Sequence, residues 1–389
     1  MRSRVERWRW GWRSPRERLC SGAVWWRVGR AAITCLLAAY GFGLLLLTPF
    51  LGAEPPLGDF GSFYASGLAA TAGDNPYLVY PLTMNSAVNL NPPPSLLLFA
   101  PLTALPTGIA RTGWFVATVL AVLATVVVLG VGPPYRLAWV IASAPFWETV
   151  SLGQIYALLA LPASLAWVLI ERRPMLSGVL IGIVAAIKPN FVLWPVLLAL
   201  AGQRHAAAAA VGTWAALNAL AVVFFGPAVF VQWLAVVTQE GPNGTPANAA
   251  VAGLLARVGL PAAIPIVDIL GVLGLVALTI KYRPGPRQLS SLALVGLLVF
   301  SPLAWVGYGL FLLPLFFERP WTPATAIAAA LLLLPRPPLT EWSQQSPILA
   351  NAYMLAWLIL LSQQVRGLLA PSSQVTPKQA RLHGTPAPS

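Results

Sequence analysis

The chain has 389 residues, of which 58% are hydrophobic and only 9% are charged. A soluble globular domain carries roughly 25% charged residues, so this chain has too few charges to cover a water-facing surface. Its mean hydropathy of +0.74 and its repeated apolar runs predict an all-α polytopic membrane protein. A barrel would show alternating strands, which are absent from these runs. The two cysteines, Cys20 and Cys35, are too few for a disulfide framework or a metal site.

The first 30 residues form a strongly basic segment. They hold nine of the 24 basic residues and only two acidic ones, with five tryptophans interleaved. This pattern predicts a cytoplasmic juxtamembrane segment over residues 1–30 that lies on anionic lipid. We expect no nucleic-acid partner despite the net charge of +13, because no DNA- or RNA-binding module accompanies the charge. A cleaved signal peptide is disfavoured because the next apolar run is long enough to span.

Thirteen apolar runs between charged residues are candidate spans. They cover residues 31–50, 94–110, 112–131, 137–150, 155–170, 175–187, 190–202, 206–225, 262–280, 288–302, 304–318, 322–335 and 348–365. The positive-inside rule places both chain ends in the cytoplasm. We therefore expect an even number, about 12 transmembrane helices, with either 94–110 or 137–150 not crossing fully. The transmembrane domain is predicted over residues 31–366, and the polar residues 367–389 are expected to form a disordered cytoplasmic tail.

The first external loop, residues 51–93, is the longest polar-containing stretch. Within it, Ser62–Ala72 can form a short juxtamembrane surface helix, and the segment Gly73-Asp74-Asn75-Pro76 has the composition of a turn. Asp59 precedes the expected helix. From the residues alone, Asp59 can equally be a helix N-cap or a catalytic carboxylate.

Further candidate residues lie near the ends of other apolar runs. Lys188 is one of three lysines and follows an apolar run in which Gly178 and Gly182 permit close helix packing. It can contact a phosphate group, or it can snorkel to the membrane interface. Glu148 and Asp268 are functional candidates because acids at membrane depth are costly.

A series of short motifs follows in a fixed order along the chain. The motifs are Asp59 with Tyr64, Gly73 before Asn75-Pro76-Tyr77, Asn91-Pro92-Pro93-Pro94, Pro101-Leu102 with Leu105-Pro106, Gly153-Gln154, Gly178 with Lys188-Pro189, and Ser301-Pro302 before Trp305 and Tyr308. This order resembles glycosyltransferase family 87, a family of polyprenol-phosphate-sugar-dependent membrane enzymes of the GT-C class. The resemblance covers roughly residues 30–320. Two positions depart from it, because the family often has tyrosine where this chain has Asn91 and histidine where it has Gly307.

The resemblance implies a GT-C fold and a set of site residues. Asp59 matches the carboxylate in the first external loop that accepts the proton of the acceptor hydroxyl as the lipid phosphate leaves. Lys188 and Gln154 are implied to bind donor phosphate or sugar, although Gln154 can also be an ordinary helix-end amide. Tyr64, Tyr308 and Trp305 complete the candidate donor site. Aromatic belts would place Tyr308 and Trp305 at a membrane interface in any case.

Several motifs are missing from the sequence. It has no Gly-rich nucleotide loop, no HExxH motif and no Cys/His cluster, so we expect no cofactor and no metal site. We therefore expect an inverting glycosyltransferase that moves one sugar, most readily mannose by the resemblance, from a polyprenyl monophosphate to a lipid or glycan acceptor. It would lie in the plasma membrane with its active site on the extracytoplasmic face. The alternative is a transporter or flippase of a lipid-linked solute, which would show paired charges within spans and repeat symmetry.

Overall fold

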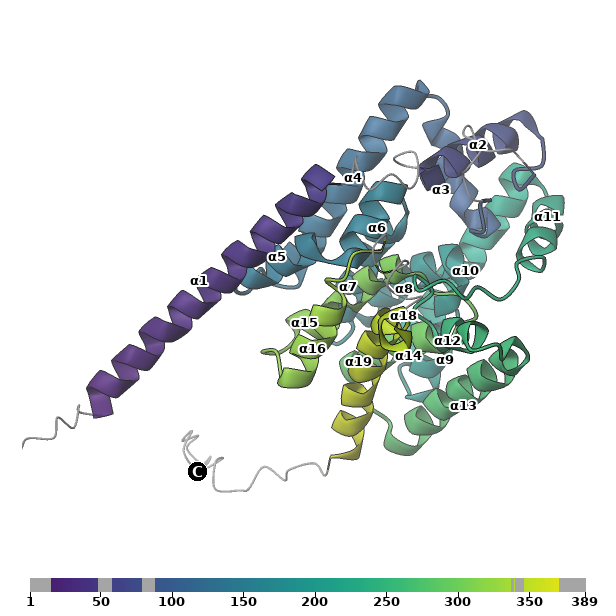
Figure 1. Ribbon diagram of the computed structural model, residues 1–389. Helices are drawn as coiled ribbons and strands as arrows, with labels where there is room; N and C mark the ends of the chain where they lie inside the picture. The colour runs from purple at the N-terminus through teal and green to yellow at the C-terminus, as the bar shows by residue number, and fades with distance from the viewer. Residues whose placement is uncertain (1–14, 48–57, 79–87, 337–338, 340–345, 371–389) are drawn as a thin grey trace, which may run out of the picture.

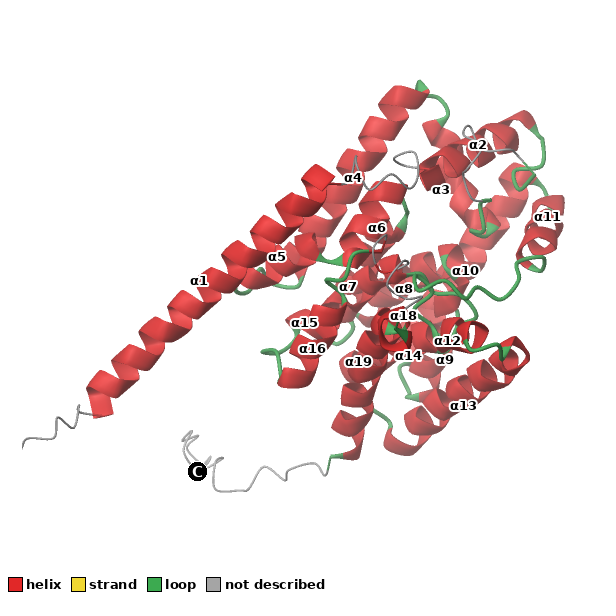
Figure 2. Ribbon diagram, viewed as in Figure 1, coloured by secondary structure: helices red, strands yellow, loops and turns green. Residues whose placement is uncertain are grey.

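The computed structural model describes residues 15–47, 58–78, 88–336, 339 and 346–370, and these residues form helices joined by loops (Figure 2). Residues 1–14 of the basic amino-terminal segment and residues 371–389 of the predicted tail lie outside the described residues. Within the described part, α1 (Pro15–Leu47) is one continuous helix of 33 residues. The second half of the predicted juxtamembrane segment therefore belongs to the same helix as the first apolar run.

In the amino-terminal half, α1 is a long helix that projects away from the rest of the chain, whereas α2 and α3 lie side by side (Figure 1). After α1 the elements of this half are α2 (Gly58–Ala72), η1 (Pro93–Ser95), α3 (Leu96–Leu102), α4 (Thr107–Val128), α5 (Pro134–Ala142), α6 (Ala144–Leu152), α7 (Tyr156–Leu169), α8 (Pro174–Ile187), η2 (Pro189–Phe191), α9 (Trp194–Leu200) and α10 (Arg204–Phe225). Many are short because proline or glycine interrupts the apolar runs, as the composition predicts.

The second half of the described chain supplies the remaining helices. They are α11 (Ala228–Val237), α12 (Val251–Arg257), η3 (Pro261–Ala263), α13 (Ile264–Tyr282), α14 (Pro286–Val299), η4 (Val306–Leu312), α15 (Leu313–Phe317), α16 (Pro323–Leu331), α18 (Pro347–Ala350) and α19 (Ala352–Leu369). Helix α14 lies at the centre, with every residue from Leu289 to Val299 buried. A helix that is apolar on all sides is stable only when it is covered by other helices, and α7, α9, α13 and α19 pack against this one.

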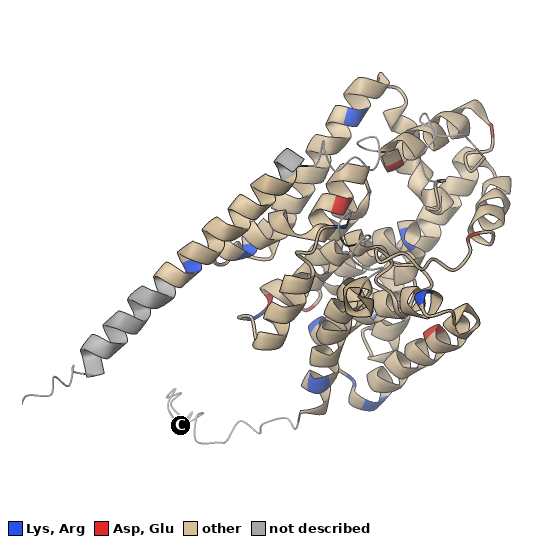
Figure 3. Cartoon of the chain, viewed as in Figure 1, with Lys and Arg blue, Asp and Glu red and all other residues tan. Residues whose placement is uncertain are grey.

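Four helical segments among the described residues are long and apolar enough to cross a membrane. They are Thr107–Val128, Arg204–Phe225, Pro261–Tyr282 and Ala352–Leu369, and several shorter apolar helices accompany them. This all-helical, apolar architecture is that of a membrane protein. Charged residues are sparse along the chain (Figure 3), and Lys281 and Arg366 lie in the last turns of α13 and α19.

Two candidate spans are divided into short elements. The run 94–110 contains α3, whose seven residues cover only about 10 Å. The run 137–150 corresponds to α5 and α6, which are separated by the extended residue Ser143. Neither run is among the helices that are long enough to cross a membrane by themselves.

Arg111 and Arg136 lie toward opposite ends of α4, although the positive-inside rule places both in the cytoplasm. Arg111 lies in the second turn of α4, which has 22 residues and is about 33 Å long, and Arg136 lies in α5, which follows the other end of α4. Arg136 donates to the carbonyl groups of Phe317 and Arg319 at 2.9 and 2.6 Å. The α2 side of the molecule lies at the other end of α4, where the Tyr64 hydroxyl donates to the carbonyl of Leu105.

Helix α2 differs from the surface helix that the sequence predicts. It begins at Gly58 instead of Ser62, and it is buried along most of its length. Phe63 stacks on Phe99 of α3 with 4.6 Å between ring centroids, and Gly67 lies against the backbone of Phe99. The aromatic side chains of α2 therefore form a core with α3 and α4. The predicted turn is confirmed, since Gly73 has φ +80° and the Asp74 amide donates to Ala69.

Helices α8 and α10 pack with their backbones close together, which confirms the role expected of two glycines. A Cβ atom on Gly178 would lie 2.2 Å from the carbonyl oxygen of Ala206, and one on Gly182 would lie 2.5 Å from that of Ala210. Such close approach between helices is possible only without a side chain.

We expect Gly178→Ala to lower the free energy of unfolding by about 1–3 kcal/mol, because the added methyl forces α8 and α10 apart. Gly212→Ala is the matched control, since Gly212 lies on α10 with nothing within 4 Å of its Cβ position. Thermal unfolding in detergent measures both variants. If Gly178→Ala and Gly212→Ala unfold at the same temperature, the contact between α8 and α10 accommodates the added methyl group without loss of stability.

Candidate functional site

The candidate site is a cavity of about 840 Å³ between α2, α6, α7 and the segments that follow α8 and α14. Its walls include the predicted residues Asp59, Gln154, Lys188, Trp305 and Tyr308. The fold thus brings together five of the six residues that the sequence singled out, from positions up to 249 residues apart. This size is typical of a site for a small molecule or a lipid head group.

Asp59 lies in the first turn of α2, and its Oδ2 atom accepts a hydrogen bond from Gln154 Nε2. A carboxylate in this position is favoured by the positive end of the helix dipole. The bond is a side-chain contact between distant segments and does not require a capping role for Asp59. It fixes the carboxylate at the wall of the cavity.

Gln154 reaches Asp59 because the chain reverses sharply before it. Gly153 ends α6 in the left-handed conformation with φ 70°, which a residue with a side chain adopts only with strain. The Gly153 carbonyl accepts a hydrogen bond of 2.7 Å from Trp114 Nε1 of α4. The Gly153-Gln154 motif is therefore a turn that directs one amide into the site.

Lys188 follows the last residue of α8 and is buried, with 7% of its surface exposed. Its Nζ atom donates to Asn91 Oδ1 at 2.6 Å and lies 4.6 and 5.2 Å from the ring centroids of Tyr156 and Tyr308. A snorkelling lysine would instead extend its ammonium group to the aqueous interface. The ammonium group of Lys188 instead lies buried at the cavity wall.

Burial also changes the acidity of this lysine, which lies outside the spanning helix. It lowers the pKa of Lys188 to about 7, while the negative charge of Asp59 acts in the opposite direction. An anionic ligand would favour the charged ammonium form. The protonation state of Lys188 can therefore respond to the charge of a bound ligand.

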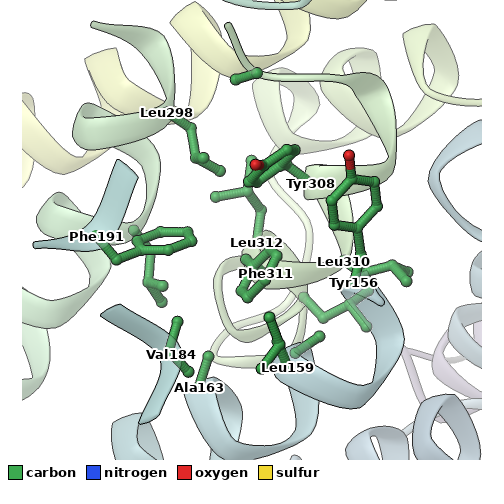
Figure 4. Close-up of a cluster of buried hydrophobic side chains, with 14 of the residues drawn as sticks. Tyr156, Leu159, Ala163, Val184, Phe191, Leu298, Tyr308, Leu310, Phe311 and Leu312 are labelled. Carbon is green, nitrogen blue, oxygen red and sulfur yellow. The ribbon is translucent and has the colours of Figure 1, made fainter. Parts of the chain in front are cut away.

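Tyr156 and Tyr308 lie at the edge of a buried apolar cluster, with both hydroxyl groups on the same side (Figure 4). Their ring centroids are 4.4 Å apart. A Cβ atom on Gly307 would lie 2.5 Å from the Tyr156 ring. The Tyr156 ring thus occupies the space beside residue 307, so a side chain at this position would collide with it.

Tyr308 is held by a further amide that sequence reasoning missed. Its hydroxyl donates to Asn190 Oδ1 at 3.2 Å, and Asn190 Nδ2 donates to Ser301 Oγ at 2.6 Å and to the Leu303 carbonyl at 3.0 Å. Asn190 follows Lys188-Pro189 in the sequence, and this adjacency is the signal that could have identified it. The loop before Trp305 is likewise fixed, because buried Asn248 pairs with it.

Tyr64 is the predicted site residue that the cavity wall does not include. Its side chain is buried, and its hydroxyl is bonded to the Leu105 carbonyl at 2.9 Å. Asn91, in contrast, lies beside Lys188, and its backbone carbonyl accepts from the Tyr77 hydroxyl at 3.0 Å. This contact joins the first external loop to the site.

No group of three or more His, Cys, Asp or Glu side chains arranged to hold a metal occurs within the described ranges. The acids of the cavity wall are Asp59, Glu148 and Glu240. Asp268 does not belong to that wall. It lies on α13, and its Oδ1 atom is buried without a hydrogen-bond partner in the described part of the chain.

Comparison with known proteins agrees with this architecture. The family model described as "Glycosyltransferase family 87" matches residues 89–304, and the chain belongs to this family. Two relatives are both named polyprenol-phosphate-mannose-dependent alpha-(1-2)-phosphatidylinositol pentamannoside mannosyltransferase. The one from Mycolicibacterium smegmatis is 30% identical over 62% of this chain and 63% of its own length. The one from Mycobacterium tuberculosis is 26% identical over 71% of this chain and 74% of its own length.

The chain thus matches less than two thirds of the first of these relatives. No solved structure matches it. Membership of a glycosyltransferase family disfavours the transporter alternative.

Proposed function

We propose that this protein is a membrane mannosyltransferase that uses a polyprenyl-phosphate-mannose donor and a glycolipid acceptor. The observation that carries the proposal is the Asp59 carboxylate, held by Gln154 in a cavity that also contains Lys188. Family membership supports sugar transfer, and the names of the two relatives support mannose, the lipid donor and a phosphatidylinositol-linked acceptor.

The proposed reaction is a single displacement. Asp59 accepts the proton of the acceptor hydroxyl, whose oxygen attacks the anomeric carbon of the sugar. The bond from the anomeric carbon to the phosphate oxygen breaks, and the lipid phosphate leaves with the electron pair. One displacement inverts the anomeric configuration. Lys188 and the Gln154 amide provide the donors that bind the phosphate or sugar.

The donor's own phosphate is the leaving group, so the proposed reaction requires no cofactor. Tyr308 and Trp305 line the cavity, and a sugar ring or an isoprenoid unit can pack against aromatic side chains. In this proposal the protein is a multi-pass protein of the plasma membrane with about 12 spans, and the cavity opens on the extracytoplasmic side.

Membranes that contain the full chain test the function directly. They are incubated with radiolabelled polyprenyl-phosphate-mannose, or with the arabinofuranose donor as a comparison, in the presence of native lipid extract. We expect labelled mannose in the glycolipid fraction. Absence of label from both donors would refute the transferase proposal, and label from the arabinose donor alone would refute mannose.

The orientation has a separate test. We expect a cysteine at exposed Asp74 to react with an impermeant maleimide on intact cells, and a cysteine at exposed Arg204 to react only after permeabilisation. The background lacks Cys20 and Cys35. Labelling of the residue-204 site on intact cells would reverse the proposed sidedness.

A further inference from the structure

A second charged pair faces the same cavity. Arg336 Nη1 donates to Glu148 Oε1 at 2.9 Å, and both side chains line the cavity wall with Asp59 and Lys188. The Glu148 side chain is 6% exposed and that of Arg336 is 33% exposed. The cost of removing such a pair from water often exceeds its Coulombic gain, and charged residues inside membrane proteins mark substrate paths. The pair is therefore a candidate contact for a charged part of the substrate.

The fold holds the segment before Arg336 from several directions. The carbonyl groups of residues 332, 333 and 334 each accept a hydrogen bond from a different helix. The donors are the Ala144 amide of α6 at 2.7 Å, the Tyr40 hydroxyl of α1 at 2.5 Å and the Tyr353 hydroxyl of α19 at 2.5 Å. Because α6 also carries Glu148, both members of the pair are fixed relative to the same helix.

Tyr156 connects this pair to the rest of the site. It lines the cavity together with Glu148 and Arg336, and the Lys188 ammonium lies 4.6 Å from its ring centroid. The two cations therefore reach the wall of one cavity from different elements, one after α8 and the other after α16. They can act on one ligand in the cavity.

We propose that Arg336, paired with Glu148, is a second cation for the lipid phosphate and stabilises the charge that this phosphate gains as it leaves. The proposal rests on the sugar transfer proposed above. The donor phosphodiester carries one negative charge. When the bond from the anomeric carbon to the phosphate oxygen breaks, the monoester formed carries about −1.5 to −2, while Asp59 takes the acceptor's proton.

One cation balances the single negative charge of the donor phosphodiester. The additional charge of the leaving monoester is balanced by a second cation. A guanidinium group has five N–H donors in a planar fork, so Arg336 can keep its bond to Glu148 while it donates to a phosphate oxygen. Interactions that are stronger with the leaving monoester than with the bound diester lower the barrier to transfer.

Binding of polyprenyl monophosphate tests the proposal without requiring turnover. The purified full chain in lipid nanodiscs is titrated with polyprenyl monophosphate and with the uncharged polyprenol of equal length. We expect the wild-type protein to prefer the phosphate, and Arg336→Gln to bind it about tenfold to hundredfold more weakly with unchanged affinity for the polyprenol. Arg172→Gln is the control, since Arg172 is exposed in the turn between α7 and α8.

A double variant guards against a folding defect in the single one. Arg336→Gln alone leaves a buried carboxylate without its cation, whereas Glu148→Gln/Arg336→Gln leaves two neutral amides that can bond to each other. We expect the double variant to fold and to lose the preference for phosphate. A folded double variant that keeps the wild-type preference for phosphate would overturn the proposal. So would a variant that binds polyprenyl monophosphate normally and loses affinity only for phosphatidylinositol. A chain that binds the phosphate through Arg336 but transfers no sugar would overturn only the proposed function.

Discussion

Asp59→Asn should lower the rate of sugar transfer by about a hundredfold to ten-thousandfold while the protein remains folded and binds its donor. The reason is that the change removes the proton acceptor, and general-base catalysis is typically worth this much. The side chain keeps its size, and asparagine is tolerated at the start of a helix about as well as aspartate. An amide at position 59 can still bond to Gln154, whose side chain supplies both a donor and an acceptor.

Initial rates with saturating donor, together with the thermal unfolding temperature, measure this effect. Asp74→Asn is the matched control, because Asp74 is an exposed turn residue outside the cavity wall. We expect its rate to equal that of the wild type. Near-normal turnover by Asp59→Asn would leave Asp59 with a structural role and would direct attention to Glu148 or Glu240, the other acids of the cavity wall.

Lys188→Ala should raise the apparent donor constant by about tenfold to hundredfold, with a smaller effect on the maximal rate. A hydrogen bond from a charged donor in a buried site contributes on the order of 1.5–3 kcal/mol, which corresponds to this factor. The variant also removes the bond to Asn91. Lys188→Met therefore accompanies it, because methionine keeps much of the apolar stem without the charge.

Donor titrations at fixed acceptor concentration separate the two kinetic parameters. Lys281→Ala is the control, since Lys281 is exposed in the last turn of α13. If both Lys188 variants retain the wild-type donor constant, the lysine does not contact the donor and serves only to pack against Tyr156 and Tyr308.

Some features of the site followed from the sequence because they are local. Gly153-Gln154 and Lys188-Pro189 each combine a polar side chain with a residue that ends a helix, and such combinations mark the place where an apolar helix leaves the membrane. Asp59 was equally a helix cap or a catalytic carboxylate from the residues alone, and the resemblance to the family singled it out. These signals depend on neighbours in sequence, so they could be recognised before the fold was known.

Other features depend on contacts between segments distant in sequence. Arg336 gave no signal, because its partner Glu148 lies 188 residues earlier. Asn91 belonged to one of the motifs, but its contact with Lys188 across 97 residues is visible only in the fold. Tyr64 shows the opposite case, since its position suggested a binding role and the fold bonds it to Leu105 instead.

The sequence by itself determined that this is an all-helical membrane protein, because its composition leaves too little charge for a water-facing surface and its apolar runs have helical length. It also indicated the glycines that bring α8 and α10 together. Only the tertiary structure decided that α2 is buried, that α5 and α6 are separate helices divided at Ser143, and that Asp59, Lys188 and Arg336 face one cavity. Hydropathy measures how each segment interacts with lipid, whereas these three results depend on how the segments pack against one another.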